Sequence, residues 1–290
     1  MLTTRTGSFP IGFRRNNSPW QKDLPQLIAW ASENKFQRID LGGEAMPAWS
    51  AVTDAGLSIG TADLLDWRGL VSPDAAKRKQ AVLTNTNQSR ACAALGVKNL
   101  FFVAIPEKPE LPRKENFGFL LDSLGALVPD LEKNGSTIAI EGWPGNGVLC
   151  CTPEAFRALF KAIPSRSIGI NYDPSHLLRM GIDPLRFLHE FADRVVHVHG
   201  KDTELLSENL YEFGHEQPAT FAPCIGYGGW AWRYTIPGQG QMRWGKAFGI
   251  LADAGYRGAV CVELEDANFN GGEVSEKSGL LMAADFLSGA

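Results

Sequence analysis

Four side chains that can bind a divalent metal ion stand at the ends of four short apolar runs. Glu141 ends the run STIAIE, Asp173 ends IGINYD, His199 ends VVHVH and Glu263 ends GAVCVE. Three carboxylates and one imidazole are a donor set that suits divalent ions with a preference for oxygen ligands. Taken alone, each of these residues could instead form an ordinary salt bridge or a core contact. The coincidence of all four at the ends of apolar runs predicts a metal centre.

The elements that would position these residues are short strands separated by helices. Apolar runs predict eight strands, at residues 10–14, 37–41, 57–62, 98–105, 137–141, 168–173, 195–199 and 258–263. Three intervening helices start with an N-cap residue followed by proline at the first helical position: Ser72–Pro73, Thr152–Pro153 and Asp183–Pro184. Strands that alternate with helices in this way predict a parallel sheet.

Eight such units predict an α/β protein with a closed (β/α)8 TIM barrel. The helix from Asp183 carries Leu185, Leu188 and Phe191 at helical spacing, and runs such as TIAI suit strands that are covered on both faces. An open doubly wound sheet is the alternative, but no GxGxxG turn follows the first strand. We expect one domain over residues 1–290, with a long aromatic loop insertion at about 203–243 after the seventh strand.

A barrel would gather the four candidate ligands at one mouth, because active sites of this fold lie at the C-terminal ends of the strands. His197 and His199 point the same way, since side chains alternate along a strand. We take His199 as the ligand because it lies nearer the end of its strand. His197 is then expected to be a packed or hydrogen-bonded histidine one layer deeper.

The same residues form recognisable motifs: a glutamate that ends the fifth strand, DxxH after the sixth, HxHxKD at the seventh and GYxGxxxxExED at the last. These motifs cover residues 136–266 and resemble the xylose isomerase-like barrel superfamily. The likeness is to its sugar phosphate isomerase/epimerase branch, which includes ketose 3-epimerases and inosose dehydratases. The resemblance implies one Mn2+, Mg2+ or Co2+ ion, with Mn2+ as first choice, bound by Glu141, Asp173, His199 and Glu263. It also implies that His176 contacts substrate hydroxyls.

The expected chemistry is removal of a proton next to a carbonyl, which becomes feasible when a cation stabilises the enediolate oxygen. Similarity to the epimerases gives the roles of base and acid to Glu141 and Glu263, on opposite faces of the substrate. We therefore expect a metal-dependent sugar isomerase or epimerase that acts on a ketose or keto-polyol. The alternative is a metal-dependent lyase or dehydratase that performs β-elimination on an oxidised sugar or keto-glycoside.

Three further residues are candidates for substrate binding. Arg233 precedes the sequence TIPGQG, near the place where related epimerases carry a substrate-contacting arginine before a PGxG turn. Lys201 follows His199 closely and would either meet a substrate oxygen or neutralise a neighbouring carboxylate. Trp143, two residues after Glu141, is the third candidate.

The insertion at 203–243 is rich in aromatic side chains, among them Tyr227, Trp230, Trp232 and Tyr234. These rings would either close a lid over a sugar or form a subunit interface. The insertion departs from the compact loop of simple ketose epimerases, and by that comparison it favours a bulky glycoside or an oxidised sugar as substrate. We expect a structural role for Glu265 and Asp266, which would bind loop amides or helix N-termini.

Composition limits the classes of partner. The chain has 290 residues, 44% of them hydrophobic, and a formal net charge of −4, which disfavours nucleic acid and anionic membranes. Five cysteines without a CxxC pair indicate neither a disulfide framework nor a structural zinc site. No apolar run reaches the roughly 18 residues of a spanning helix. We therefore expect a soluble, cytoplasmic protein with a small-molecule carbohydrate substrate and no nucleic-acid or membrane partner; a homodimer or homotetramer is left open.

Two other functions fit the sequence less well. The abasic-site endonuclease branch of the superfamily needs several histidines on early strands, and no histidine precedes His176. A non-catalytic sugar-binding subunit would not need the full set of candidate ligands. An enzyme therefore remains the prediction.

Overall fold

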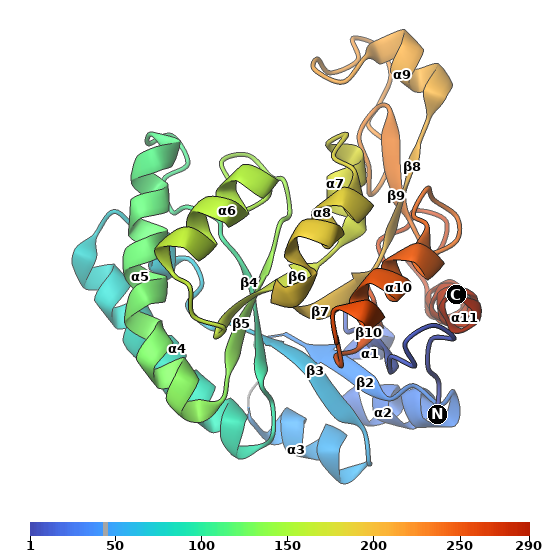
Figure 1. Ribbon diagram of the computed structural model, residues 1–290. Helices are drawn as coiled ribbons and strands as arrows, with labels where there is room; N and C mark the ends of the chain where they lie inside the picture. Colours follow the sequence, from blue (N-terminus) through green and yellow to red (C-terminus); the bar gives the residue numbers. More distant parts are fainter. Residues whose placement is uncertain (43–45) are drawn as a thin grey trace.

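The computed structural model describes residues 1–42 and 46–290 and shows a closed barrel of parallel strands surrounded by helices (Figure 1). The barrel strands are β1 (Ile11–Arg14), β2 (Arg38–Leu41), β3 (Ser58–Asp63), β4 (Asn99–Val103), β5 (Thr137–Glu141), β6 (Ile168–Tyr172), β7 (Val195–Gly200) and β10 (Val260–Val262). They follow the order β1-β10-β7-β6-β5-β4-β3-β2, and pairing of Ile11 with Val260 closes the ring. Each predicted strand corresponds to one barrel strand, so the prediction of a (β/α)8 TIM barrel is confirmed.

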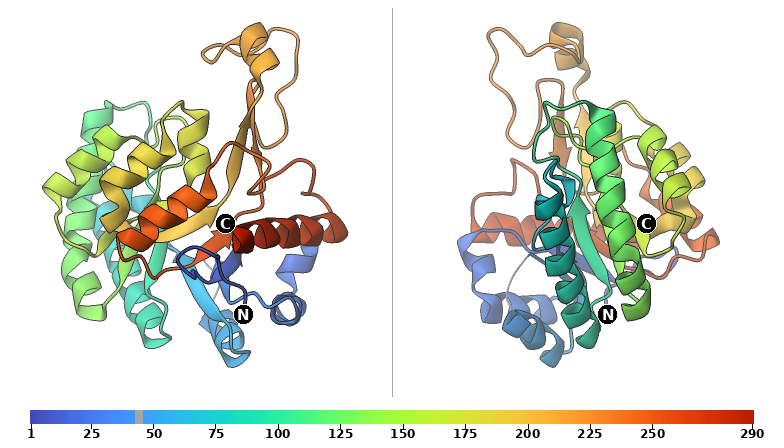
Figure 2. Two further views of the ribbon diagram at one scale, coloured as in Figure 1. Left: turned by 45° about the vertical axis from the view of Figure 1, so that its right-hand side comes forward. Right: turned by 90° about the vertical axis from the view of Figure 1, so that its left-hand side faces the viewer.

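Helices alternate with the strands and cover the outside of the barrel (Figure 1). They are α1 (Pro19–Lys22), α2 (Leu24–Glu33), α3 (Met46–Asp54), α4 (Ala75–Ala94), α5 (Arg113–Asn134), α6 (Pro153–Ala162), α7 (Pro174–Arg179), α8 (Pro184–Phe191), α9 (Ser207–Phe213), α10 (Trp244–Asp253) and α11 (Glu273–Gly289). Figure 2 shows α4 and α5 lying side by side along the barrel.

Two of the three predicted helix starts are confirmed. Thr152 accepts a hydrogen bond from the amide of Ala155 at the start of α6, and Asp183 caps α8. The prediction for Ser72 is wrong, because α4 begins two residues later with Asp74 as its N-cap. The Ser72 hydroxyl instead accepts the amide of Asp74 and donates to Glu107, which fixes the turn before the helix.

The packing of α8 illustrates why the outer helices bind the barrel. Leu185, Leu188 and Phe191, expected on one face from their spacing, are all buried. The ring centroid of Phe187 lies 4.8 Å from that of Phe191 and 5.6 Å from that of Phe156 on α6. Burial of each such side chain contributes about 2 kcal/mol, and Phe187 also stacks on Tyr172 of β6 with ring centroids 6.3 Å apart, so this aromatic layer packs on β6.

The segment after β7 begins and ends as a strand pair, β8 (Asp202–Leu205) and β9 (Trp232–Thr235). The strands are antiparallel, with Asp202 opposite Thr235 and Leu205 opposite Trp232. Figures 1 and 2 show this hairpin standing away from the barrel with α9 near its tip. The segment 203–243 is therefore not a loop throughout, as the sequence analysis expected, because aromatic and β-branched residues such as Thr203, Tyr234 and Thr235 favour strand pairing.

Two buried aspartates fasten the base of the insertion. Asp202 accepts hydrogen bonds from the amides of Thr203 and Met242, at 2.8 and 2.9 Å, and from the indole of Trp244. Asp266 accepts the amide of Ile236 at 3.2 Å, in agreement with its expected role as a loop anchor. The insertion is therefore fixed at both ends.

Candidate metal centre and active site

The carboxyl ends of the strands bring three of the predicted ligands into direct contact. Glu141 ends β5, His199 lies on β7, and Glu263 directly follows β10. The distance from His199 Nδ1 is 2.6 Å to Glu141 Oε2 and 3.2 Å to Glu263 Oε2. Parallel strands end at the same side of a barrel, and this is why residues 122 positions apart in sequence (263 − 141) share one space.

Asp173 joins the group from the start of α7. Its Oδ1 accepts the amide and hydroxyl of Ser175, at 2.9 and 2.6 Å, so the carboxylate also caps the helix. Its Oδ2 lies 3.3 Å from Lys201 Nζ and 3.4 Å from His176 Nε2. One oxygen is thus used by the helix, and the other faces the cluster.

The arrangement fits a metal ion. Asp173 Oδ2 and His199 Nδ1 are buried and have no hydrogen-bond partner among the described residues. The short approach of His199 Nδ1 to Glu141 lacks the alignment of a hydrogen bond, as when two ligands point at a common ion. Such unpartnered buried atoms cost free energy, and a bound cation would remove that cost.

His176 belongs to the same space. One ligand atom each from Glu141, Asp173, His176 and Glu263 lie within 4.8 Å of one another. His176 Nε2 is 3.3 Å from Glu141 Oε1. Two imidazoles therefore border the site, His176 beside Asp173 and His199 beside Glu263, whereas the sequence assigned only His199 as a ligand.

Both proposed catalytic glutamates are held as carboxylates. Burial and the charge of Glu263 raise the pKa of Glu141, but contacts with His199 and His176 prevail and hold it well below its usual range. Burial likewise raises the pKa of Glu263, while Lys201, His199 and Arg14 lower it further than burial raises it. Ionised carboxylates can bind a cation or accept a proton.

Lys201 supplies positive charge inside the cluster. Its side chain is 1% exposed, and Nζ donates to Glu263 Oε2 at 2.5 Å and to Glu265 Oε2 at 2.8 Å. Burial alone would lower the pKa of Lys201, but the surrounding carboxylates of Asp173, Glu263 and Glu265 raise it well above normal. Of its two expected roles, neutralisation of carboxylates is the one that these contacts provide; substrate contact stays a prediction.

A buried pair lies one layer below the cluster. His197 Nε2 is 2.8 Å from Asp40 Oδ2, and the same oxygen lies 3.5 Å from His199 Nε2. His197 is therefore the hydrogen-bonded histidine that the sequence suggested, one layer below His199. Asp40, on β2, was missed, although a carboxylate near the end of an apolar strand is the same signal that identified the ligands.

Two other site residues escaped the sequence analysis. Arg14, at the end of β1, makes a paired contact with Asp63 at 3.0 and 2.9 Å, and its Nε lies 3.3 Å from Glu263 Oε1. Asn171, on β6, donates to Glu141 Oε2 at 2.7 Å. Each glutamate thus has its own polar partner that fixes its orientation.

The predicted substrate-binding residues differ in position. His176 and Lys201 face the cluster, as described above. Arg233 instead donates to Glu204 at 2.7 Å and approaches Asp266 at 3.4 Å, and no ion pair within the described residues joins it to the ligands. Trp143 is 37% exposed and its ring lies on Gly145. Substrate contact by Arg233 and Trp143 stays a prediction.

The insertion touches the site through Tyr234 on β9. The phenol oxygen lies 2.7 Å from His176 Nδ1 and accepts a hydrogen bond of 2.7 Å from Arg179. Arg179 also donates to the carbonyl of Pro144 and stacks on Trp232. The base of the hairpin therefore packs on α7 at the edge of the candidate site, where a lid would be expected.

The chain belongs to the xylose isomerase-like TIM barrel family, which it matches over residues 26–287. The uncharacterised protein YfiH of Bacillus subtilis (strain 168) is 34% identical over 143 residues, which are 48% of this chain and 44% of that protein. An inosose dehydratase of Geobacillus thermodenitrificans (strain NG80-2) is 28% identical over 159 residues, 55% of this chain and 50% of the relative. These matches span about half the length of the curated relatives.

Solved structures share the whole fold. The apo form of the 3-keto-D-glucoside 4-epimerase YcjR from E. coli aligns with a TM-score of 0.71 and 17% identity, covering 96% of this chain and 99% of that one. The IOLI protein, solved with a zinc atom, aligns with a TM-score of 0.65 and 17% identity, covering 96% and 95%. At these identities the likeness establishes the barrel.

Within residues 1–42 and 46–290, none of the helices is long and apolar enough to cross a bilayer.

Proposed function

We propose that this protein is a divalent-metal-dependent sugar isomerase or epimerase in which Glu141 and Glu263 carry protons. The observation behind the proposal is the approach of both carboxylates to one buried imidazole nitrogen, at 2.6 and 3.2 Å from His199 Nδ1. The proposed ligands are Glu141, Asp173, His199 and Glu263, and the proposed ion is Mn2+, with Mg2+ or Co2+ as alternatives. When bound, such an ion supplies positive charge that makes a proton next to a substrate carbonyl acidic.

The residues of this chain would divide the work as follows. Glu141 and Glu263 come from β5 and β10, which are separated in the barrel by β6 and β7, so they reach the shared space from different directions. One carboxylate accepts the proton from the carbon next to the carbonyl. The other glutamate, a carboxylate in the substrate-free protein, would first take up a proton from solvent and then donate it to the opposite face, which inverts the stereocentre. Asn171 and Lys201 hold the two carboxylates in position.

A dehydratase is the second candidate, and the relatives named inosose dehydratase favour it. The same base would remove the same proton. The electron pair would then expel a hydroxyl group from the next carbon, and the acid would protonate it so that it leaves as water. The two reactions need the same residues and differ in the substrate and in the fate of the electron pair.

The first test is metal content by mass spectrometry after Mn2+ reconstitution and desalting. We expect one equivalent in the wild type, loss in Glu263→Gln, and retention in Glu208→Gln, a control on the exposed first turn of α9. Wild-type protein without bound metal would contradict the four-ligand site.

The second test separates the two reactions. Ketoses and oxidised glycosides are incubated with the Mn2+-loaded protein in D2O. Deuterium at an inverted carbon with no loss of mass as water supports the epimerase. A product lighter by one water identifies the dehydratase. If metal-loaded protein produces neither deuterium incorporation nor loss of water with any of these substrates, both proposed reactions are refuted.

A further inference from the structure

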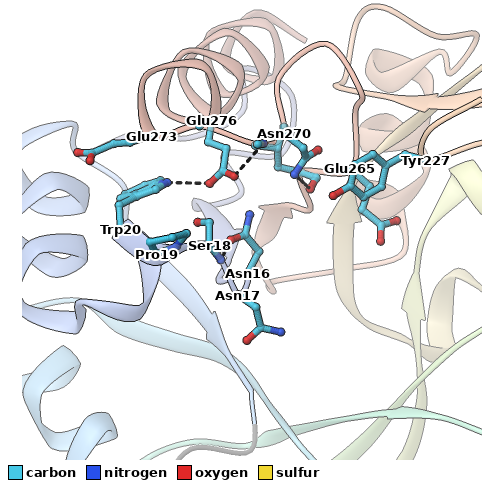
Figure 3. Close-up of a pocket in the computed structure, with 13 residues that line it drawn as sticks. Asn16, Asn17, Ser18, Pro19, Trp20, Tyr227, Glu265, Asn270, Glu273 and Glu276 are labelled. Atoms are coloured by element: carbon cyan, nitrogen blue, oxygen red, sulfur yellow. Dashed lines mark hydrogen bonds between the residues drawn. The ribbon is translucent and has the colours of Figure 1, made fainter.

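A cavity of about 560 Å3 opens beside the carboxylate cluster at the same end of the barrel. It lies between the segment that follows β1, the segment that follows β10, and the start of α11. Figure 3 shows Trp20 and Glu276 on one side of it and Glu265 with Tyr227, from the insertion, on the other. Its volume is within the range of about 300–1,000 Å3 typical of small-molecule sites.

The cavity is connected to the candidate active site through one residue. Glu265 lines the cavity, and its Oε2 accepts a hydrogen bond of 2.8 Å from Lys201. The same Lys201 nitrogen is 2.5 Å from Glu263. A molecule that reacts at Glu263 and extends past Lys201 would therefore enter this cavity.

The lining is suited to neutral hydroxyl groups. The polar groups that line it are amides, carboxylates, one serine hydroxyl, the Tyr227 phenol and the Trp20 indole; the amides and carboxylates include those of Asn16, Asn17, Asn270, Glu265 and Glu273. No lysine or arginine is among the described residues that line it, so a phosphate or carboxylate group would find no counter-charge there. Amide and carboxylate groups instead bind sugar hydroxyls.

The cavity also contains an aromatic side chain, Tyr227, that can pack on a sugar ring. Tyr227 is 46% exposed, and its backbone has φ of 54°, the left-handed region that non-glycine residues rarely adopt. Its carbonyl accepts the amide of Tyr234 at 2.8 Å, which holds the strained turn. The ring is thus presented at the cavity at a cost of about 1–2 kcal/mol, and such a face packs well on the C–H surface of a sugar.

The opposite wall is built before any ligand arrives. Glu276, on α11, accepts hydrogen bonds from the Trp20 indole at 2.7 Å, from Gln21 at 3.1 Å and from the Gly271 amide at 3.3 Å. These contacts join the segment after β1 to the start of α11. A preformed wall avoids the ordering cost that weakens binding to a mobile surface.

We propose that this cavity binds a second, neutral sugar ring, so that the substrates are glycosides whose reacting ring lies at the carboxylate cluster. The inference rests on the proposed function, and it names the substrate class of the same site. A free ketose would fill the cluster and leave the cavity to water.

The test compares binding of neutral disaccharides with binding of glucose by calorimetry on the Mn2+-loaded protein. The probes are maltose, cellobiose and sucrose, with glucose 6-phosphate as the anionic comparison. Tyr227→Asn removes the ring but keeps a residue that tolerates positive φ. Tyr211→Asn is the matched control, because Tyr211 is 89% exposed on α9. Each preparation is matched for metal content and melting temperature.

We expect at least one disaccharide to bind about tenfold more tightly than glucose. This preference should persist in Tyr211→Asn and fall severalfold in Tyr227→Asn, and glucose 6-phosphate should show no gain over glucose. Equal binding of glucose and all three disaccharides, or a preference that Tyr227→Asn leaves intact, overturns the proposal.

Deuterium uptake and metal content, measured on the same preparations, separate this inference from the proposed function. Metal and exchange without a disaccharide preference would refute the second-ring site alone. A disaccharide preference without metal or exchange would refute the proposed reaction alone.

Discussion

Replacement of Glu276 by glutamine should destabilise the protein by about 2–3 kcal/mol. The carboxylate is 2% exposed and accepts three N–H donors, from Trp20, Gln21 and Gly271. Glutamine offers one oxygen, which can keep the bonds to Trp20 and Gln21 at neutral strength. Each of these two then loses about 1 kcal/mol, and the amide NH2 group faces the Gly271 N–H without an acceptor, which costs about 1 kcal/mol more.

The loss of unfolding free energy in Glu276→Gln should be larger at neutral pH than in acid. Burial raises the pKa of Glu276, but the hydrogen-bond donors around it prevail and lower it. A carboxyl group whose pKa is depressed in the folded state stabilises the fold above its unfolded pKa, about 4.3, and loses that contribution as the pH falls through the folded pKa. The difference between wild type and Glu276→Gln should therefore be full at pH 7 and shrink in acid.

The assay is urea unfolding followed by circular dichroism at several pH values. Thermal melts at pH 7 should show a melting temperature of Glu276→Gln lower by about 4–12 °C, from about 2–4 °C per kcal/mol for chains of about 150–250 residues. Glu273→Gln is the control, since that side chain is 44% exposed and pairs on the surface with Lys277, where about 0.5 kcal/mol is at stake. If Glu276→Gln loses no more unfolding free energy at pH 7 than Glu273→Gln does, the reasoning about the three donors is wrong.

Three further predictions use other features of the fold. Gly118→Ala in α5 should raise the free energy of unfolding by about 0.5–1 kcal/mol in urea titrations, because no described heavy atom lies within 4 Å of the added carbon. Gly60→Ala should destabilise by about 1–3 kcal/mol or more in the same assay, since its Cβ would lie 2.1 Å from an Asp40 oxygen. Iodoacetamide at pH 8 should label the exposed Cys224 in the native protein, as measured by mass spectrometry. Cys92 should react only after urea unfolds the chain, because burial raises the pKa of its thiol to about 12.

The ends of the strands were predictable from sequence because local pattern encodes them. Each apolar run that ends in a polar residue marks where a strand leaves the core, and this was enough to place Glu141, Asp173, His199 and Glu263 at one mouth. Their assembly into a barrel followed from the alternation of strands and helices. Arg14 also ends an apolar strand, but a guanidinium is not a metal ligand, and its contact with Glu263 arises only where β1 and β10 lie side by side.

The partners within the site could not be predicted, because they depend on packing between distant segments. Arg14 contacts Asp63 across 49 residues, and Asp40 contacts His197 across 157. Local sequence carries no sign of such pairs. The hairpin was missed for a related reason, since its two strands are separated by 26 residues (205 to 232) without a tight turn signal.

The position of Lys201 among three carboxylates also has a consequence for mutagenesis. Its nitrogen lies within 3.3 Å of acidic oxygens from Asp173, Glu263 and Glu265, so the strength of each contact depends on which others are present. Free-energy changes at these positions will not add, and double-mutant cycles should give coupling energies of about 0.5–3 kcal/mol. Variation at this mouth, in evolution or in the laboratory, is therefore expected to proceed by paired exchanges that conserve the total charge.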